Sequence, residues 1–285
     1  MNPYFSDADR DAAEQFLLSR IDYERAATIP YQRDFKLDRM VRFLAKLGNP
    51  HVGLKVVHIA GTKGKGSTAA MIASVLSAAG YRTGLYTSPH LEHVEERIRI
   101  DNVQILADSF VELIERIRPV VTELDDEAAQ ETPPSQGPTY FEVLTAMAFV
   151  YFADHHVDWA VLEVGMGGRL DSTNVCHPAV SVITSISFDH TKQLGTTLGE
   201  IAAEKAGIVK PGVPVVSGVV EDEPREVIRH VAAQHGCRLV ERTIDFYAQY
   251  RPVVQVEIAT AKISLPALRS TSVCDCLVTN TRFAI

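Results

Sequence analysis

The glycine-rich run from His58 to Thr68, HIAGTKGKGST, constrains the fold more than any other part of this chain. It follows the β-branched pair Val56–Val57 and precedes a stretch of small residues, Ala69–Ala79, that predicts a helix. A strand, a glycine-rich turn and a helix start direct backbone N–H groups and the positive end of the helix toward an anion. The sequence therefore predicts a phosphate-binding loop, and with it a nucleoside triphosphate site.

The candidates for holding the nucleotide are Gly61, Thr62, Lys63, Gly64, Lys65, Gly66, Ser67 and Thr68. The Lys65 ammonium can reach terminal phosphates, and the Ser67 hydroxyl can bind Mg²⁺. The common P-loop places Ser or Thr directly after the lysine, whereas Gly66 intervenes here, which disfavours a simple P-loop kinase. The alternatives are a plain glycine turn, a solvated lysine and a serine that caps the helix.

The composition is globular and limits the class of partner. The chain has 285 residues, 46% hydrophobic and 22% charged, which suits one large domain or two smaller ones. A net charge of −8 argues against nucleic acid as a partner. Cys274 and Cys276 lack a second pair for zinc, and four cysteines do not suggest a disulfide framework. The polar start and the lack of a long apolar stretch predict a cytoplasmic protein without a membrane partner.

Strand patterns alternate with helix patterns along most of the chain. Short apolar runs predict strands over Val56–Ile59, Thr83–Tyr86, Trp159–Leu162, Ala179–Ser185, Val213–Ser217 and Arg238–Val240. Helices are predicted over Ala12–Arg20, Lys36–Leu47, Ser67–Ala79, Ser109–Val121, Phe141–Phe152, Leu198–Ile208 and Glu223–His235. The alternation predicts an α/β fold with a P-loop and a doubly wound, mostly parallel sheet. The acidic stretch Glu123–Pro138 is expected to be a solvated loop.

Two of these helices have informative apolar patterns. In Lys36–Leu47 the i, i+3, i+4, i+7 spacing predicts burial of Leu37, Met40, Val41 and Leu44. The run Phe141–Phe152 is apolar on all sides, which predicts a buried helix. A lone Glu142 in such a helix requires a partner if it is buried.

After Thr243 the alternation stops. The runs Asp245–Tyr250, Val253–Ile258 and Ala261–Leu265 predict short consecutive strands, and so a β-rich C-terminal segment. From Arg269 to Ile285 the sequence has no persistent period.

The candidate loops all follow predicted parallel strands. They are Gly61–Ser67, Thr87–His90, Gly165–Asn174 and Ser187–His190. Because ligands of doubly wound sheets bind outside the carboxyl ends of the strands, we expect these four loops to converge on one site.

Several runs of the chain carry a family resemblance when they are taken together. They are His58–Ser67, Thr87–Leu91 with Glu96–Ile98, Thr139–Glu142, Leu162–Asn174, Asp189–His190 and Ala203–Ile208. In order and spacing they resemble the folylpolyglutamate synthase and dihydrofolate synthase family of the Mur-ligase superfamily, over approximately residues 12–265. The fold that this implies is the Mur-ligase central domain.

The resemblance implies an ATP-dependent ligase. The γ-phosphate of ATP is transferred to a carboxylate of a folate or dihydropteroate, and the amine of L-glutamate attacks the acyl phosphate to form an amide. ATP and Mg²⁺, the latter at two sites, are the implied cofactors, and a monomer is expected. Phosphoryl transfer requires positioning and positive charge, which the glycine-rich loop offers. The alternatives are a non-catalytic nucleotide-binding remnant and a Mur-type cell-wall peptide ligase, which the run Thr87–Arg97 disfavours.

The resemblance also implies residue roles. The implied metal ligands are Ser67, Ser88, Glu142, His190 and Lys205, with Lys205 carbamylated at the second metal. The implied catalytic residues are Lys65, His190 and Lys205. The loop near the folate comprises Thr87, Ser88, Pro89, His90 and Arg97, and Asn174 is assigned to the nucleotide. The residues alone allow other interpretations: a helix-dipole role for Glu142, a loop role for His190 and a surface ion pair for Lys205.

The implied domain plan is an ATP-binding domain over residues 1–265 and an unaligned tail over 266–285. The family has a second, C-terminal α/β domain that contributes to the ATP and glutamate sites, and no segment of this chain aligns with it. Beyond Pro266 both pattern and resemblance end. The hypothesis from the sequence is a truncated or frame-shifted product with impaired activity.

Overall fold

The computed structural model describes residues 5–23 and 37–247 of the chain. Backbone contacts divide the chain into a unit Met1–Leu239 and a unit Val240–Ile285. The first unit contains the helices and most of the sheet, which position the candidate site. The strands predicted at Val253–Ile258 and Ala261–Leu265, most of Asp245–Tyr250, and the tail 266–285 lie outside the described residues.

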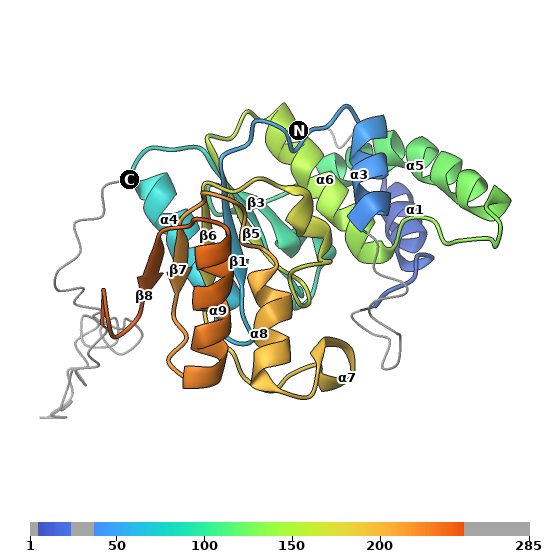
Figure 1. Cartoon of the computed structure of the whole chain (residues 1–285). Helices are drawn as coiled ribbons and strands as arrows, with labels where there is room; N and C mark the ends of the chain where they lie inside the picture. The colour runs from blue at the N-terminus through green and yellow to red at the C-terminus, as the bar shows by residue number, and fades with distance from the viewer. Residues whose placement is uncertain (1–4, 24–36, 248–285) are drawn as a thin grey trace, which may run out of the picture. The chain divides into compact units, whose positions relative to one another are not determined.

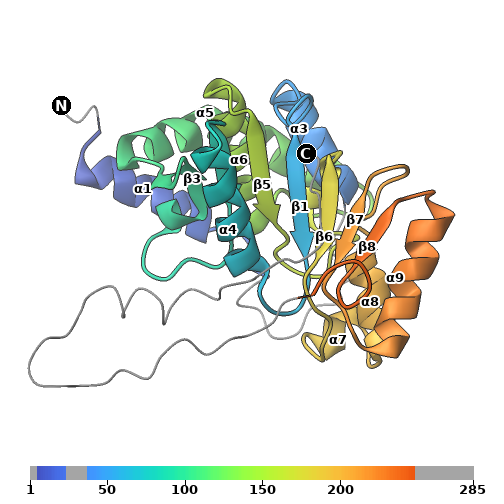
Figure 2. The same cartoon turned by 90° about the vertical axis from the view of Figure 1, so that its left-hand side faces the viewer.

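An eight-stranded sheet has the order β4-β3-β2-β5-β1-β6-β7-β8. Its strands are β1 (Val56–Ala60), β2 (Thr83–Tyr86), β3 (Ile98–Ile100), β4 (Val103–Gln104), β5 (Trp159–Glu163), β6 (Val180–Ile183), β7 (Val215–Ser217) and β8 (Leu239–Glu241). The pairs β2–β5, β5–β1, β1–β6 and β6–β7 are parallel, and β3 and β4 add an antiparallel edge. Figure 2 shows β5 and β1 running in the same direction. The mostly parallel α/β sheet is thus confirmed.

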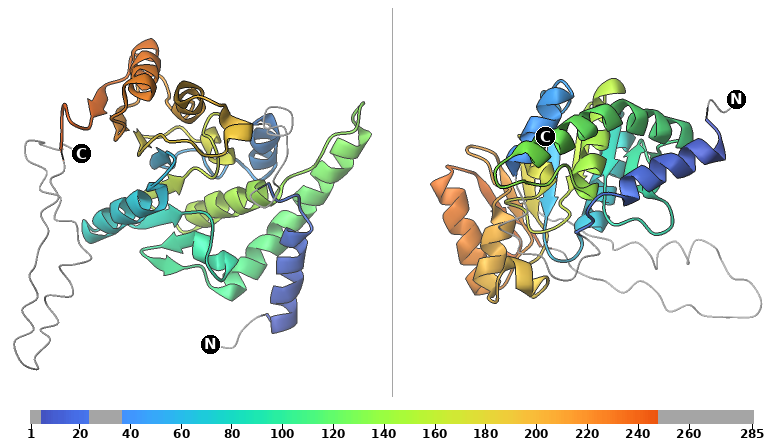
Figure 3. Two further views of the ribbon diagram at one scale, coloured as in Figure 1. Left: turned by 90° about the horizontal axis from the view of Figure 1, so that it is seen from below. Right: turned by 90° about the vertical axis from the view of Figure 1, so that its right-hand side faces the viewer.

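Helices cover both faces of the sheet (Figure 1). They are α1 (Asp7–Leu18), α3 (Leu37–Lys46), α4 (Lys65–Ala78), α5 (Ala107–Gln130), α6 (Tyr140–Asp154), α7 (Thr191–Leu194), α8 (Leu198–Ala206) and α9 (Asp222–Gln234). The short 3₁₀ segments η1 (Val94–Arg97) and η2 (Ser172–Val175) lie in the connections. Figure 3 shows α1 alongside α5.

The two faces of β1 belong to different cores, because side chains alternate along a strand. Val57 and Ile59 pack with the small side chains of α4, such as Ala69 and Ala73. Val56 packs with the aromatic and aliphatic residues of α3, α5 and α6. A third core joins β6 and β7 to α8 and α9. The carboxyl ends of the central strands therefore lie between layers of packed helices.

The first half of the acidic segment that the sequence assigned to a loop, up to Gln130, is helical, so the loop prediction was wrong for that half. Helix α5 continues to Gln130, with Leu124 and Ala128 buried four residues apart. On its other face, Glu127 pairs with Arg42 and Lys46 of α3 at 2.7 and 2.9 Å. Long-range apolar and ionic contacts thus stabilise a stretch whose composition favours solvent.

Two further details differ from the sequence prediction. In α3 the buried side chains are Met40, Phe43 and Leu44, whereas Val41 is 49% exposed, so the buried stripe is rotated from the one expected. The hairpin of β3 and β4 was not predicted, because each strand is too short to show a period. Among the helices in the described part of the chain, none has the length and apolar character of a bilayer-spanning segment.

Candidate functional site

The glycine-rich loop ends in an uncapped helix start. Helix α4 begins at Lys65, two residues earlier than predicted, with Gly64 as its N-cap at φ +80°. No side chain caps this end and its first turn has no acidic residue, while the first helical bond is from the N–H of Thr68 to the carbonyl of Gly64. The N–H groups of the preceding first-turn residues therefore have no intrahelical acceptor, as an anion site requires.

The loop after β6 fixes the conformation of the glycine-rich loop. The Thr62 hydroxyl donates to the carbonyl of Ser187 at 3.2 Å and accepts from the N–H of Ser187 at 3.1 Å. The N–H of Lys63 donates to Ser185 Oγ at 3.0 Å. Gly61, at φ +149°, lies so close to Thr184 that a Cβ would overlap its hydroxyl. Two of the predicted loops are therefore joined at one edge of the sheet.

A second junction connects the ends of β5 and β2. Glu163, the last residue of β5, is 4% exposed, and its Oε2 accepts a hydrogen bond from the N–H of Ser88 at 3.2 Å. A Cβ on Gly66 would lie 3.1 Å from the same oxygen, so the carboxylate lies against the first turn of α4. Glu163 is not among the site residues predicted from the sequence. A carboxylate at the carboxyl end of a buried strand was the signal available.

Glu142 has partners of a different kind. Its carboxylate accepts from Arg39 Nε at 2.8 and 3.0 Å, and also from the N–H of Thr139 at 2.8 Å. Thr139 and Glu142 form a capping box at the start of α6. The partner that a buried Glu142 requires is thus a guanidinium, and we replace Glu142 by Glu163 as the acidic candidate near the phosphate loop.

Lys205 is buried at the end of α8, with 3% of its surface exposed. Its Nζ donates to the carbonyl of Gly61 at 2.9 Å, which places it beside the glycine-rich loop. Burial, followed by the charge of Lys65, lowers the pKa of Lys205 to about 8. About a tenth of this amine is therefore neutral at pH 7, and the neutral share rises with pH. The surface ion pair with Glu204 does not form, since Glu204 pairs with Arg169 at 2.8 Å.

His190 is exposed and caps the short helix α7 at φ +47°. The imidazole Nε2 of His190 lies 3.7 Å from Asp189 Oδ2. The backbone N–H of His190 donates to the same carboxylate at 2.9 Å. The charge of Asp189 also acts on the pKa of Lys205, in the raising direction, so this segment lies near the glycine-rich loop. Within the described residues no three His, Cys, Asp or Glu side chains form a ready metal cluster.

The loop after β2 is held by its own side chains. The Glu96 carboxylate accepts from the N–H groups of Leu91, Glu92 and His93. These bonds lower the pKa of Glu96 to about 2. Arg97, only 2% exposed, donates from Nε to His90 Nδ1 at 2.9 Å. The expected substrate residues His90 and Arg97 thus contact each other.

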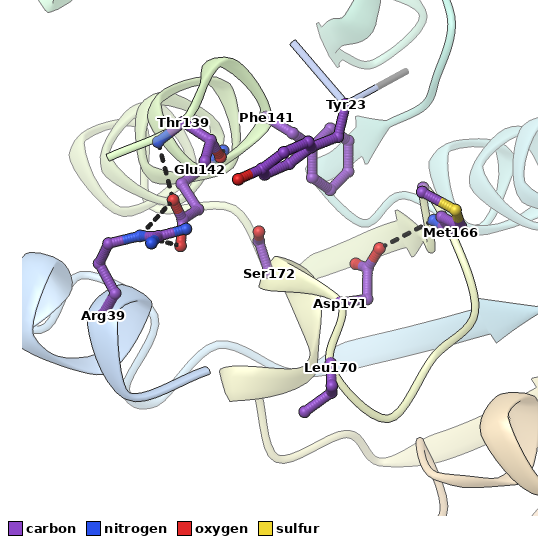
Figure 4. Close-up of a pocket in the computed structure, with 10 residues that line it drawn as sticks. Tyr23, Arg39, Thr139, Phe141, Glu142, Met166, Leu170, Asp171 and Ser172 are labelled. Atoms are coloured by element: carbon purple, nitrogen blue, oxygen red, sulfur yellow. Dashed lines mark hydrogen bonds and ion pairs between the residues drawn. The ribbon is translucent and has the colours of Figure 1, made fainter. Parts of the chain in front are cut away.

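A small pocket with a cavity volume of about 30 Å³ opens beside this region. Its lining comprises Tyr23, Arg39, Thr139, Phe141, Glu142, Gly165, Met166, Leu170, Asp171 and Ser172. Figure 4 shows the Glu142 carboxylate turned toward Arg39 and the Asp171 carboxylate toward Met166. Gly165 allows this geometry, because a Cβ there would lie 2.6 Å from the Phe141 ring. The pocket therefore combines aromatic rings with two buried carboxylates.

Asn174 has a structural set of contacts. Its side-chain amide donates to the carbonyls of Arg169 and Gly207 at 2.9 and 3.1 Å. These bonds fasten the loop after β5 to the end of α8. The structure gives the Asn174 amide nitrogen backbone partners, and the assignment of Asn174 to the nucleotide stays a prediction.

Comparison with known proteins places this geometry in a family. The Mur ligase middle domain matches residues 59–264. The chain is 46% identical over 200 residues to the dihydrofolate synthase/folylpolyglutamate synthase of Bacillus subtilis, covering 70% of this chain and 45% of that protein. It is 41% identical over 208 residues to the folylpolyglutamate synthase of Lacticaseibacillus casei, covering 73% and 47%. The chain thus spans about half the length of these curated relatives.

Solved structures give the same result. The Thermotoga maritima folylpolyglutamate synthase superposes with a TM-score of 0.74 at 39% identity, covering 86% of this chain and 52% of that one. A complex of FPGS with AMPPCP and folate superposes with a TM-score of 0.77 at 36% identity, covering 86% and 57%. On the match to residues 59–264, the chain belongs to the Mur ligase middle-domain family.

Proposed function

We propose that this chain carries the phosphate and pteridine sites of an ATP-dependent ligase that joins L-glutamate to a folate or dihydropteroate carboxylate. The observation that carries the proposal is the uncapped start of α4 facing the Ser88–Glu163 junction. The relatives named folylpolyglutamate synthase and dihydrofolate synthase support the reaction type.

The nucleotide would lie along the glycine-rich loop. The first-turn N–H groups of α4 would bind phosphate oxygens, and Lys65 would add the positive charge that phosphoryl transfer requires. FPGS has been solved with AMPPCP, which supports ATP as the nucleotide. The transfer forms a bond from the substrate carboxylate to the γ-phosphorus and releases ADP. The glutamate amine then attacks the acyl carbon and displaces inorganic phosphate.

The residues present fit a magnesium ion, because the donor set consists of oxygens. The Ser67 and Ser88 hydroxyls and the Glu163 carboxylate would hold it, since Mg²⁺ prefers one or two carboxylates with phosphate oxygens and water. When bound, it would neutralise charge on the transferring phosphoryl group. His190 and Lys205 remain the proposed ligands of a second ion.

Lys205 suits the carbamate that the family resemblance implies. A carbamate forms when a neutral amine attacks carbon dioxide and its nitrogen releases one proton to solvent, and the pKa of about 8 leaves Lys205 partly neutral. The product is an anion beside the carbonyl of Gly61. This anion would replace the unfavourable buried ammonium of Lys205 near Lys65, and its oxygens would be available to bind a metal ion.

The pteridine ring of the substrate would lie against the pocket beside Phe141. Phe141 and Tyr23 offer faces on which a flat heterocycle can stack. The FPGS complex that contains folate supports this class of ligand. The pocket extends the proposed substrate site beyond Thr87, Pro89 and the His90–Arg97 pair.

The proposal is tested by nucleotide binding and ADP release on the purified 285-residue chain. Mg²⁺-dependent binding of AMPPCP, measured by calorimetry, should be lost in Lys65→Ala and retained in the matched control Lys55→Ala. ADP release should then require both pteroate and glutamate. Binding without any substrate-dependent ADP release would favour the non-catalytic alternative. An unaltered affinity in Lys65→Ala would refute the phosphate site.

A further inference from the structure

The N-terminal helix holds the loop after β2 through one ion pair. Nε of Arg10 in α1 donates to Oε1 of Glu95 in η1 at 2.8 Å, between residues 85 positions apart in the chain. The Glu95 side chain is 5% exposed, and that of Arg10 is 29% exposed. A helix at the start of the chain therefore supplies the cation for a buried carboxylate in the loop that contains His90 and Arg97.

Glu95 depends on this cation. Its Oε1 accepts from Arg10, whereas its Oε2 is buried and has no hydrogen-bond partner among the residues that the structure describes. The bond to Glu95 raises the pKa of Arg10, so the guanidinium stays charged. Because a buried carboxylate without a counter-charge is strongly unfavourable, loss of the Arg10 guanidinium would drive the Glu95 side chain toward water.

Arg10 acts from a fixed support. Arg10, Ala13 and Leu17 lie on one face of α1, at the i, i+3, i+7 spacing. Ala13 and Leu17 are buried in the same core cluster as Val94, the first residue of η1. The helix and the 3₁₀ turn thus share a core, and the ion pair adds a charged contact to this apolar one.

The turn η1 connects Glu95 to the exposed part of the loop. Glu96, the next residue, accepts from the N–H groups of residues 91–93 at 3.0, 2.8 and 2.8 Å. Arg97, one position further, donates to Nδ1 of His90 at 2.9 Å. A rotation of η1 that exposed Glu95 would therefore move Glu96 and Arg97 and release the residues that they hold.

We propose that Arg10 is a positioning residue that keeps Glu95 buried and so holds the loop after β2 in the conformation that receives the pteridine substrate. The loop follows the carboxyl end of β2, the edge at which such sheets bind ligands. The inference rests on the proposed function, because it takes the loop as part of the substrate site. Arg10 itself touches no ligand.

The effect of Arg10 is confined to the part of the loop beyond Ser88. The N–H of Ser88 is held separately, by Glu163 at 3.2 Å, and the glycine-rich loop is joined to the loop after β6 through Thr62 and Ser187. Affinity for the nucleotide should therefore not depend on Arg10, whereas affinity for the pteridine should.

The first test compares Arg10→Gln with Arg10→Lys in the full chain. Glutamine removes the charge and lysine retains it. The matched control is Arg116→Gln, which removes an exposed arginine that pairs with Asp154 at 2.6 Å. Hydrogen exchange measured by mass spectrometry should be about ten-fold faster at residues 91–93 in Arg10→Gln, and within about three-fold of wild type in Arg10→Lys. Exchange in the control should match wild type.

The same variants are then titrated with pteroate and with AMPPCP. We expect Arg10→Gln to weaken pteroate binding about ten-fold, as loss of one hydrogen bond to a charged group implies, with AMPPCP affinity unchanged. Arg10→Lys should restore most of the pteroate affinity. Exchange at residues 91–93 equal to wild type, or faster exchange with unaltered pteroate affinity, would overturn the positioning role.

A double variant keeps the test decisive if Arg10→Gln does not fold. Arg10→Gln combined with Glu95→Gln removes the buried charge together with its partner, so the loop should regain slow exchange and pteroate affinity near that of wild type. Fast exchange in a folded double variant would refute the role assigned to the charge pair. A wild-type chain that binds AMPPCP but no pteroate would overturn the pteridine site of the proposed function, and with it this inference.

Discussion

The Oε2 atom of Glu163 accepts a hydrogen bond from the N–H of Ser88 at 3.2 Å, which joins the ends of β5 and β2 beside the first turn of α4. This contact places a buried carboxylate within reach of the oxygen ligands that the sequence had already selected, Ser67 and Ser88. It distinguishes Glu163 from Glu142, whose carboxylate is neutralised by Arg39 at 2.8 Å.

The two glutamates should respond differently to removal of charge. Glu163→Gln should abolish the Mg²⁺ dependence of AMPPCP binding and leave the melting temperature near that of wild type, because it removes a metal ligand. Glu142→Gln should retain the Mg²⁺ dependence but destabilise the fold by about 3 kcal/mol, because a buried Arg39 loses its counter-charge. Calorimetry with and without Mg²⁺, together with urea unfolding, distinguishes the two. Identical behaviour would count against our exchange of Glu142 for Glu163.

The side chain at position 165 should control the pteridine pocket. In Gly165→Ala, the new methyl group would meet the Phe141 ring at 2.6 Å and push it into the pocket. We expect pteroate affinity to fall by about ten-fold and AMPPCP affinity to be unchanged, since one crowded methyl group costs about 1–3 kcal/mol. Parallel titrations with both ligands measure this. A loss confined to AMPPCP would contradict the placement of the pocket.

Buried His58 should make the stability of the fold dependent on pH. Its pKa is about 3 in the folded chain and 6.5 in its ordinary state, so the unfolded chain binds more protons between these values. The free energy of unfolding should therefore rise with pH from about 3 to 6.5, by at most roughly 5 kcal/mol from this residue. Urea unfolding at several pH values should show a weaker acid dependence in His58→Gln than in wild type. Parallel curves for the two proteins would show that His58 titrates normally.

Lys205 should take up carbon dioxide as the pH rises. Its pKa of about 8 means that the reactive neutral amine increases across that value. Incubation with ¹³C-bicarbonate should give a carbamate signal in the ¹³C NMR spectrum that grows with pH and is absent in Lys205→Arg. The control Lys210→Arg, on a lysine that instead donates to the carbonyl of Asn174, should retain the signal. A signal equally strong in Lys205→Arg would assign the carbamate to another amine.

Much of the fold followed from the sequence, because parallel strands in an α/β protein are short apolar runs between helices. The strand Thr83–Tyr86 has the predicted bounds, and β1 and β5 extend one residue further than predicted. The loops expected to converge do so through Thr62–Ser187 and Glu163–Ser88. Because parallel strands run in the same direction, the loops that follow their carboxyl ends meet at one edge of the sheet.

The errors come from contacts between residues distant in sequence. The pairing of Arg39 with Glu142 joins residues far apart in the chain, and no local pattern reveals it. The capping box formed by Thr139 and Glu142 was visible as a Thr-x-x-Glu spacing and indicated a structural role for the glutamate. Helix α5 extends past Val121 because Arg42 and Lys46 of α3 supply cations to its glutamates.

The most direct test of the account is formation of the amide product by the purified 285-residue chain. Wild type, Lys65→Ala and Glu163→Gln are each incubated with pteroate, L-glutamate and Mg²⁺-ATP. The products are separated by chromatography and identified by mass spectrometry. We predict a glutamate adduct of pteroate in wild type only, formed in equal amount to ADP. Adduct formation that persists in Lys65→Ala or Glu163→Gln, or ADP formed without adduct, would contradict the ligase site described here.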